Sequence, residues 1–480
     1  MSLSAAFSRA HSIFSNASEQ FSTLVKNIEN SGNKNYVRRE VSTVNIPHEM
    51  TVVTKKRVQD HNMFQKVLDA SSSFSGQQKL LDSFESLKEI MGCDNDYNSS
   101  PAHYIGKFQD YLQTYANNSS SDIFGRQVIE SAVDVVNNLK SSARKVQKIR
   151  TDADKEIDLE ISHLRQFLDE LTVVNNSIKS DTSFEGNANE LLDRRDSLLQ
   201  QISEIIGIST VTRRNNDIVV YTSSGSTLFE TLPRDITFLK TESYSAAVES
   251  KPVFIDGIMV SITDNNVIPR GKIEALLQIR DGIIPTFQSQ LDEISRGFVN
   301  IFYEKDPNGH SQPVPGLFIV DGLASPSDKL YNGMSELICI NPKYQSNPYF
   351  LRDGGSSSPN YQWNPNGFSG YSDLINSYRT ALNKNFSFDS VTGISANTNL
   401  LEYGRNSIGW LEKNRSNSHD VYMKNQVAFN HISDSYSNYT GVNLQEELSF
   451  LMQVEQSYNI SNKLMNSINS MMNTLLEGIR

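Results

Sequence analysis

The residues that could carry out acid–base, nucleophilic or metal chemistry are few and widely separated in this sequence. The 480 residues include eight histidines and two cysteines. No histidine lies near a cysteine or at ligand spacing from a second histidine. The patterns of serine hydrolases, P-loops, zinc proteases and dinucleotide-binding loops do not occur in a usable context. The sequence therefore predicts that the protein is not an enzyme and holds neither a metal nor a cofactor.

Acidic side chains recur at alternate positions of one stretch, which resembles a set of metal ligands. They are Asp152, Asp154, Glu156, Asp158 and Glu160. Alternate residues of a helix point in divergent directions, so these side chains are not expected to converge on one ion. We therefore interpret the stretch as the solvated face of a helix.

Composition argues against several other classes of protein. The net charge is −11 and no segment is dominated by basic residues, which disfavours nucleic-acid binding. Cys93 and Cys339 are far apart and outside any CxxC pair, so neither a disulfide framework nor a zinc site is expected. No apolar run has transmembrane length, and the first residues lack a signal-peptide pattern. We expect a soluble, extended protein that, if it leaves the cell, does so without a cleaved secretory signal.

Helices at the two ends of the chain show the clearest periodicity. Near the N-terminus, four- and three-residue steps alternate through Leu3, Phe7, Ala10, Phe14, Ala17, Phe21, Leu24 and Ile28. Near the C-terminus the same alternating steps run through Val454, Tyr458, Ser461, Met465, Ile468, Met472, Leu475 and Ile479. The assembly seam that we expect on this helix also includes Leu448 and Leu451. Such a narrow apolar stripe is a coiled-coil seam, which an isolated helix cannot bury. We expect these helices to pair with each other, with neighbouring copies, or both; the alternative is two ordinary amphipathic helices packed on a globular core.

Between the ends, the sequence predicts mostly helix. Helical spacing that begins at Asp122 continues to Ile178, and no Pro or Gly interrupts the chain from Arg126 to Phe184. A helix of nearly sixty residues is about 80–90 Å long. Further helices are expected from about Gln59, again over 76–90, then over 104–112, 187–206, 272–303 with a bend at Pro285, 371–382 and 400–438. Short β-type runs lie at 218–221, 227–229, 252–255 and 258–260, with Asp256-Gly257 as a hairpin turn.

The expected fold class is mainly α with β insertions: terminal coiled-coil helices, a bundle of long helices and β or irregular domains. The expected domains are a terminal helical assembly domain (1–58 plus 441–480), a helical bundle (59–209 plus 270–305 plus 371–440), a small β insertion (210–269) and a β or irregular insertion (306–370).

Four stretches carry a resemblance to known proteins. The first contains Asn27, Asn30, Gly32, Tyr36 and Arg38; it resembles the rod–hook–junction motif of flagellar axial proteins, with Lys34-Asn35 in place of the usual Pro-Gly and Gly32 suited to a left-handed C-cap. The second contains Leu192, Asp193, Arg195 and Asp196, the third Arg280 and Asp281, and the fourth Gly441, Asn443, Leu444, Glu446 and Glu447. In this order the last three resemble the flagellar hook-associated protein 1 family, the first hook–filament junction proteins. In the fourth, Asn443 is also expected to cap a helix, with Glu446 at its third position.

This resemblance implies a structural protein of the flagellum that serves motility. Terminal helices would pack inside a tube and inserted domains would face outward. The chain would be exported unfolded through the flagellar type III channel and assembled outside the cell as the layer between hook and filament. Implied partners are copies of itself in a ring, the hook protein, the second junction protein and an export chaperone that holds the C-terminal helix; neither nucleic acid nor membrane insertion is expected.

Two alternatives remain open. The chain could be another flagellar axial protein, such as a hook or rod subunit or a flagellin. It could instead be a secreted adhesin that uses Tyr361, Trp363 and Phe368 of the 306–370 insertion as an outward surface, although aromatic residues in such a loop more often form a small local core.

Overall fold

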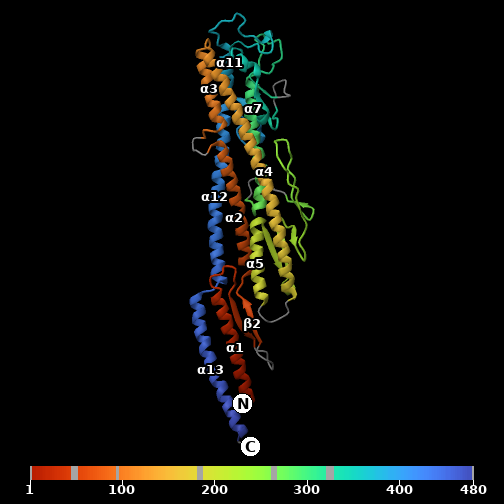
Figure 1. Cartoon of the computed structure of the whole chain (residues 1–480), viewed down its shortest axis with the longest axis vertical. Coiled ribbons are helices and arrows are strands. Elements are labelled where there is room, and N and C mark those ends of the chain that lie inside the picture. Colours follow the sequence, from red (N-terminus) through yellow and green to blue (C-terminus); the bar gives the residue numbers. More distant parts are fainter. Residues whose placement is uncertain are drawn as a thin grey trace.

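The computed structural model of the chain describes residues 3–44, 52–92, 97–180, 187–260, 268–320 and 329–477. It is a long rod of roughly aligned helices with both termini at one end (Figure 1). α1 (Leu3–Glu29) and α13 (Leu444–Glu477) lie side by side and form that end, which extends beyond the bundle. No helix among the described residues is long and apolar enough to span a membrane. The predicted fold class, mainly α with β insertions, is confirmed.

The bundle is built from long helices and several short ones. They are α2 (His61–Met91), α3 (Pro101–Asn117), α4 (Asp122–Ser180), α5 (Asn187–Ile205), α6 (Lys272–Gln278), α7 (Ile284–Ile301), α8 (Met334–Leu337), α9 (Pro342–Ser346), α10 (Phe350–Asp353), α11 (Asp373–Asn383) and α12 (Leu400–Thr440). α4 buries one face from Val128 to Ile178 because its apolar residues keep helical spacing throughout.

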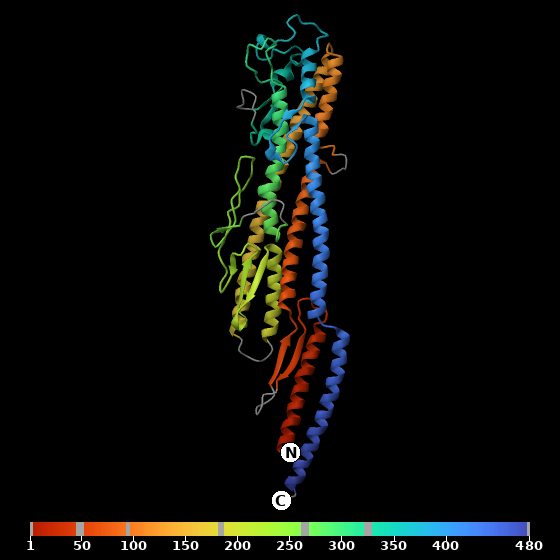
Figure 2. The same cartoon turned by 180° about the vertical axis from the view of Figure 1, so that it is seen from behind.

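Small antiparallel sheets lie beside the helices. β1 (Arg39–Val44) pairs with β2 (Val52–Arg57) beside α1, and Figure 2 shows this hairpin from behind. The other sheets are β3 (Ile208–Thr212), β4 (Ile218–Thr222) and β5 (Thr227–Phe229); β6 (Ile236–Thr237), β7 (Phe254–Ile255) and β8 (Ile258–Met259); β9 (Phe318–Val320) with β10 (Ile338–Ile340); and β11 (Phe386–Ser387) with β12 (Asn397–Thr398). Asp256 and Gly257 both have positive φ, as the predicted hairpin turn between β7 and β8 requires.

The buried apolar side chains of the described residues form two hydrophobic cores along the rod. The one nearer the termini packs α4 and α5 against the β3–β4–β5 sheet through side chains such as Ile157, Leu198 and Phe229. The other packs α3, α4, α7 and α12 together, and includes the edge-to-face rings of Phe108 and Phe302. α4 contributes to both cores, so it connects the two halves of the bundle.

The predicted separation of two helices before Gly76 is wrong, because α2 runs unbroken from His61 to Met91. A Cβ on Gly76 would lie 2.5 Å from the carbonyl oxygen of Pro269 and 2.9 Å from that of Gly271. Gly76 therefore lets the 269–271 backbone approach α2 closely, and its role is in packing.

Gly76→Ala is therefore expected to destabilise the bundle, although Gly→Ala inside a helix normally stabilises by about 1 kcal/mol. The new methyl group must displace backbone, and overpacking of this kind typically costs about 1–3 kcal/mol. Gly409→Ala in α12 is the matched control, since nothing lies within 4 Å of its Cβ position. Urea unfolding should show opposite signs for the two variants; a stabilised Gly76→Ala would contradict the packing role.

The bend expected at Pro285 is a π turn over Ile279–Ile283, immediately before α7. Proline has no N–H and its ring crowds the preceding turn of an α-helix. The wider π turn relieves this crowding, and α7 then continues as a regular helix.

Interpretation of the acidic stretch as a solvated face is wrong for two of its members. Asp154 is 0% exposed and Glu160 is 8% exposed. Asp154 accepts hydrogen bonds from Arg280 (2.7 Å), the Tyr244 hydroxyl (3.2 Å) and the Thr241 N–H. It fixes the 241–244 segment against α4 and the π turn.

In its described residues, the 306–370 insertion contains the short α-helices α8, α9 and α10 in addition to the expected β and irregular structure. Glu304 at its start is 2% exposed and accepts from the Tyr344 hydroxyl (2.8 Å) and from the N–H groups of Ser356 and Ser357. This carboxylate holds the insertion together.

Candidate functional site: the joint between the terminal helices and the bundle

Residues from three of the four motif stretches meet where α1 and α13 join the bundle. We call this cluster the joint; it consists of Asn27, Tyr36, Arg38, Arg39, Arg57, Asp193, Asp196, Glu446 and Glu447. α1 ends here, β1 begins here, α5 supplies the two aspartates and α13 begins with the two glutamates. The third stretch, with Arg280 and Asp281, lies elsewhere, at the π turn.

Asn27 is the centre of the joint and is fully buried. Its Nδ2 donates to the Arg39 carbonyl oxygen and to Glu447 Oε2, both at 3.0 Å. Its Oδ1 accepts from the Tyr36 hydroxyl (2.8 Å) and from the Arg39 N–H (3.2 Å). One amide side chain thus joins α1, the loop before β1, and α13.

Two arginines on the β1–β2 hairpin connect the joint to α5. Arg39 and Arg57 are opposite each other in the strand register. Arg39 Nη2 lies 3.1 Å from Asp193, and Arg57 reaches both Asp193 (2.8 Å) and Asp196 (2.6 Å). Both arginine side chains are 4% exposed, so these ion pairs are buried and each charge depends on its partner.

Arg38 connects the same loop to the start of α13. Its N–H donates to the Thr440 carbonyl oxygen at 2.7 Å, and its guanidinium lies 3.6 Å from Glu446 and 3.9 Å from Glu447. Asn443 accepts from the N–H of Gln445 (3.1 Å) and of Glu446 (3.5 Å), which confirms the predicted cap.

Burial shifts the pKa values of three side chains in and beside the joint. It raises the pKa of Tyr36 to about 12, so the hydroxyl keeps the proton that it donates to Asn27. It also raises the pKa of Asp193, against the opposing effects of Arg57 and Arg39, and lowers the pKa of Arg195.

Other motif residues have local roles. Gly32 does not take the expected left-handed conformation, since its φ is not positive; the chain turns at Asn33, which accepts from the N–H groups of Asn35 and Tyr36. Asn30 donates to the Lys26 carbonyl oxygen, and Leu192 packs against the core nearer the termini. A Cβ on Gly441 would lie 2.4 Å from the Ser437 carbonyl oxygen.

The expected seam residues divide into three groups. Ala10, Ala17, Ser461 and Ile468 are buried between α1 and α13, and the rings of Phe14 and Tyr458 are 4.8 Å apart. The second group is half-buried and consists of Phe7, Leu24, Ile28, Leu451, Val454 and Met465. The third group is exposed and consists of Phe21, Leu448, Met472 and Leu475. Leu3 begins α1, and Ile479 lies outside the described residues. Whether the seam is an assembly surface remains a prediction.

Sequence reasoning missed Arg39 and Arg57 as functional candidates. Arg39 directly follows the motif arginine, Arg38, and Arg57 ends a strand, so both positions were visible. Their significance depends on pairing with Asp193, which is more than 130 residues away in the chain.

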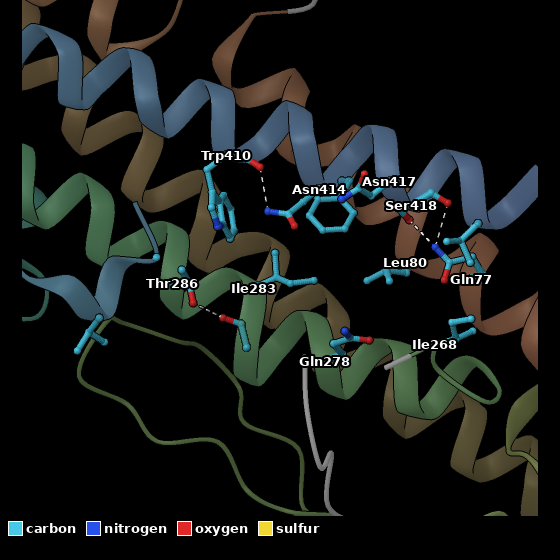
Figure 3. A pocket seen from close by; sticks show the side chains of 15 residues that line it. Gln77, Leu80, Ile268, Gln278, Ile283, Thr286, Trp410, Asn414, Asn417 and Ser418 are labelled. Carbon is cyan, nitrogen blue, oxygen red and sulfur yellow. Dashed lines mark hydrogen bonds between the residues drawn. The ribbon is translucent and has the colours of Figure 1, made fainter. Parts of the chain in front are cut away.

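A cleft of about 360 Å³ opens where α2, α7 and α12 separate (Figure 3). Gln77 donates across it to Ser418, and Asn414 donates to the carbonyl oxygen of Trp410 in its own helix. Among the described residues that line the cleft, none is acidic, basic, histidine, cysteine or tyrosine. Those side chains offer no general acid or base. In the described part of the chain, no three His, Cys, Asp or Glu side chains are grouped so as to hold a metal ion.

Comparison with known proteins finds similarity to flagellar hook-associated proteins. Residues 87–311 match the family model of the flagellar hook-associated protein FlgK helical domain. Two curated proteins named flagellar hook-associated protein 1, from Salmonella typhimurium strain LT2 and Salmonella typhi, are each 21% identical over 235 residues, which is 47% of this chain and 41% of the relative. The chain thus spans about two-fifths of the length of the curated relatives it matches.

A solved structure is also similar, that of the flagellar hook junction protein FlgK from Burkholderia pseudomallei. It aligns with a TM-score of 0.44 and 18% identity over 53% of this chain and 46% of that one. The family match includes the second and third motif stretches, whereas α1, β1 and α13 lie outside it. The resemblance inferred from the motifs is confirmed: residues 87–311 match the FlgK helical domain, and the chain is similar to flagellar hook-associated proteins.

Proposed function

We propose that the chain is a structural subunit of the bacterial flagellum that forms the junction layer between hook and filament. One observation carries the proposal: the α1–α13 pair projects from the bundle through the joint and leaves large apolar side chains in water. On α1 and α13 these are Ile13, Phe21, Leu444, Leu448, Phe450, Met452, Ile460, Leu464, Met471, Met472 and Leu475, each at least 41% exposed. Exposed apolar surface of this extent indicates a protein interface.

In this proposal α1 and α13 contact copies of the chain in a ring, and the layer lies between the hook protein and the second junction protein. The terminal domain is 1–58 plus 441–480, and the bundle carries the insertions outward. Export without a cleaved signal, through the flagellar type III channel, precedes assembly outside the cell, with a chaperone on the C-terminal helix. The subunit has no catalytic role.

Immunogold labelling of intact flagella tests the location. We expect a single band of label where hook meets filament. Label along the whole hook or filament would instead identify another axial subunit, and label on the cell surface would identify an adhesin.

Phe14→Asp tests the assembly role of the terminal pair. The variant places a carboxylate against Tyr458 where helices of neighbouring subunits are expected to converge, and an unpaired buried charge costs several kcal/mol. We expect cells with hooks but without filaments, by electron microscopy, while the circular dichroism and melting of the bundle barely change. His11→Asp is the control, because His11 is exposed on α1. Filaments of normal length on Phe14→Asp cells would contradict an assembly role for the seam.

A further inference from the structure

The apolar seams of α1 and α13 do not by themselves determine how the two helices are aligned. The ring of Phe14 packs on that of Tyr458. Asn27 is hydrogen-bonded to Glu447, so residue numbers rise along α1 as they fall along α13 and the pair is antiparallel (Figure 2). Both seams repeat every seven residues and are apolar at almost every position. Two such seams can also pack after one helix slides along the other by one repeat, which is about 10 Å.

A slide of α1 by one repeat toward the chain termini would keep apolar residues opposite one another. Phe14 would then face Met465, and Phe21 would take its place opposite Tyr458. The connection at 30–38, between α1 and β1, is long enough for this slide, because each extended residue spans up to about 3.3–3.6 Å. Burial of apolar surface therefore distinguishes poorly between the observed register and the slipped one.

Asn27 distinguishes strongly between the two registers. Its buried amide donates two hydrogen bonds and accepts two, the full number for this side chain, with Glu447, the Tyr36 hydroxyl and the backbone of Arg39 as partners. In the slipped register Asn27 would face Val454, seven residues beyond Glu447. It would lose the bond to Glu447 and move away from its other partners. A buried amide without partners is costly, so Asn27 disfavours the slipped register.

Two other buried polar side chains of the helix pair lack this property. The Thr23 hydroxyl on α1 donates to the Glu19 carbonyl oxygen at 2.8 Å. The Ser461 hydroxyl on α13 donates to the Ser457 carbonyl oxygen, also at 2.8 Å. Each of these bonds lies within one helix and is kept when that helix slides. Neither residue can therefore select a register.

We propose that Asn27 is the positioning residue that fixes the register of α1 against α13, as one buried asparagine fixes the alignment of a coiled coil. The register decides where the exposed Ile13 and Phe21 of α1 lie relative to the exposed Phe450 and Ile460 of α13. A slide of about 10 Å would rearrange that composite apolar surface. A neighbouring copy that fits one arrangement would not fit the other. This consequence for assembly rests on the proposed function, whereas the register itself does not.

Photocrosslinking within the purified full-length chain tests the register directly. Phe14 is replaced by the photoreactive p-benzoylphenylalanine, and products with the mass of a single chain are digested with trypsin. Cleavage after Lys463 places Tyr458 and Met465 in different peptides, so the two registers give different crosslinked products. With Asn27 present we expect the Tyr458 peptide to be the main product. Asn27→Leu should raise the ratio of Met465 to Tyr458 products by about tenfold or more, because the slipped register no longer strands a buried amide.

Thr23→Val is the matched control, since it removes a buried polar group from α1 that makes no bond to α13. It should leave the ratio unchanged. An unchanged ratio for Asn27→Leu would overturn the proposal, because another feature would then set the register. Loss of both products would also overturn it, because Asn27 would then only hold the helices together. Melting of the bundle checks that each variant is folded, since its two cores contain no described residue of α1 or α13.

Electron microscopy of cells that carry the same two substitutions separates this inference from the proposed function. We expect hooks without filaments for Asn27→Leu and filaments of normal length for Thr23→Val. Normal filaments on Asn27→Leu cells, together with a shifted crosslink ratio, would refute assembly through the terminal pair and leave the register assignment in place. An unshifted ratio would refute the register assignment alone, whatever the filaments look like.

Discussion

Arg280→Met should lower the free energy of unfolding of the bundle by about 3–5 kcal/mol, the usual cost of removing one partner from a buried ion pair. Arg280 is 1% exposed, and Asp154, its partner, is 0% exposed. The variant leaves the Asp154 carboxylate buried with only the Tyr244 hydroxyl and the Thr241 N–H as donors. These neutral donors cannot balance its charge.

A second variant separates the cost of the orphaned charge from the loss of packing. Asp154→Leu combined with Arg280→Met removes both charges, and replacing a buried pair by apolar residues is often close to neutral. We expect the double variant to regain most of the lost stability. The Tyr244 hydroxyl and the Thr241 N–H then each lose a hydrogen-bond acceptor, which limits the recovery.

Lys155→Met is the matched control on α4. Lys155 pairs with Asp152 at 3.3 Å with both side chains more than half exposed, and an exposed pair contributes about 1 kcal/mol or less. Urea unfolding followed by circular dichroism gives the unfolding midpoint of each of the three variants. A change of less than 1 kcal/mol for Arg280→Met would show that the buried pair contributes no more than an exposed one.

The helices could be predicted from the sequence because their signal is local. α4 shows helical apolar spacing over its full 59 residues, and the 4-3 steps at the two ends of the chain define α1 and α13. Turn chemistry likewise located Asp256-Gly257 and the Asn443 cap. Each of these features depends on residues fewer than eight positions apart.

Errors arose where a distant part of the chain determines the outcome. Asp154 has the same spacing as its solvated neighbours, and only the 241–244 segment and Arg280 make it a buried acceptor. A separate helix was expected to begin at Gly76, whereas α2 runs through it and the 269–271 backbone packs against it. Gly32 looked like a C-cap, yet Asn33 makes the turn.

The joint shows the same limit in the candidate site. Its motif residues could be singled out from the sequence, since each stretch resembles a known pattern. That Asn27, Asp193 and Glu447 would meet could not be predicted, because their contacts span up to 420 residues of sequence. Arg57 carries no motif and gains its role only from the β1–β2 register.

Asp193→Asn should release the α1–α13 pair from the bundle without unfolding either. The change leaves Arg39 and Arg57, both 4% exposed, without the carboxylate that they share. Asp196 still balances Arg57 (2.6 Å), but Arg39 is left with Glu190, which is 3.7 Å away and 62% exposed. Because a buried charge without its partner costs about 3–5 kcal/mol, attachment through the β1–β2 hairpin should fail first.

Limited proteolysis can measure this release, because the connections at 30–38 and 441–443 become accessible when the joint opens. We expect cleavage there to accelerate by more than about a hundredfold, which corresponds to the loss of about 3 kcal/mol when opening is in rapid equilibrium. The bundle should melt as before, since its two cores do not include Asp193.

Arg194→Ala, one residue along the same helix, is the control. Arg194 pairs with Glu170 on the surface, with side chains 49% and 38% exposed, and such a pair is worth about 1 kcal/mol or less. It should leave cleavage of the connections within about fivefold of the unchanged protein. Both substitutions lie on α5, so a large difference between their cleavage rates is attributed to the charge at the joint. Equal cleavage rates would mean that α1 and α13 are held by their apolar contacts alone.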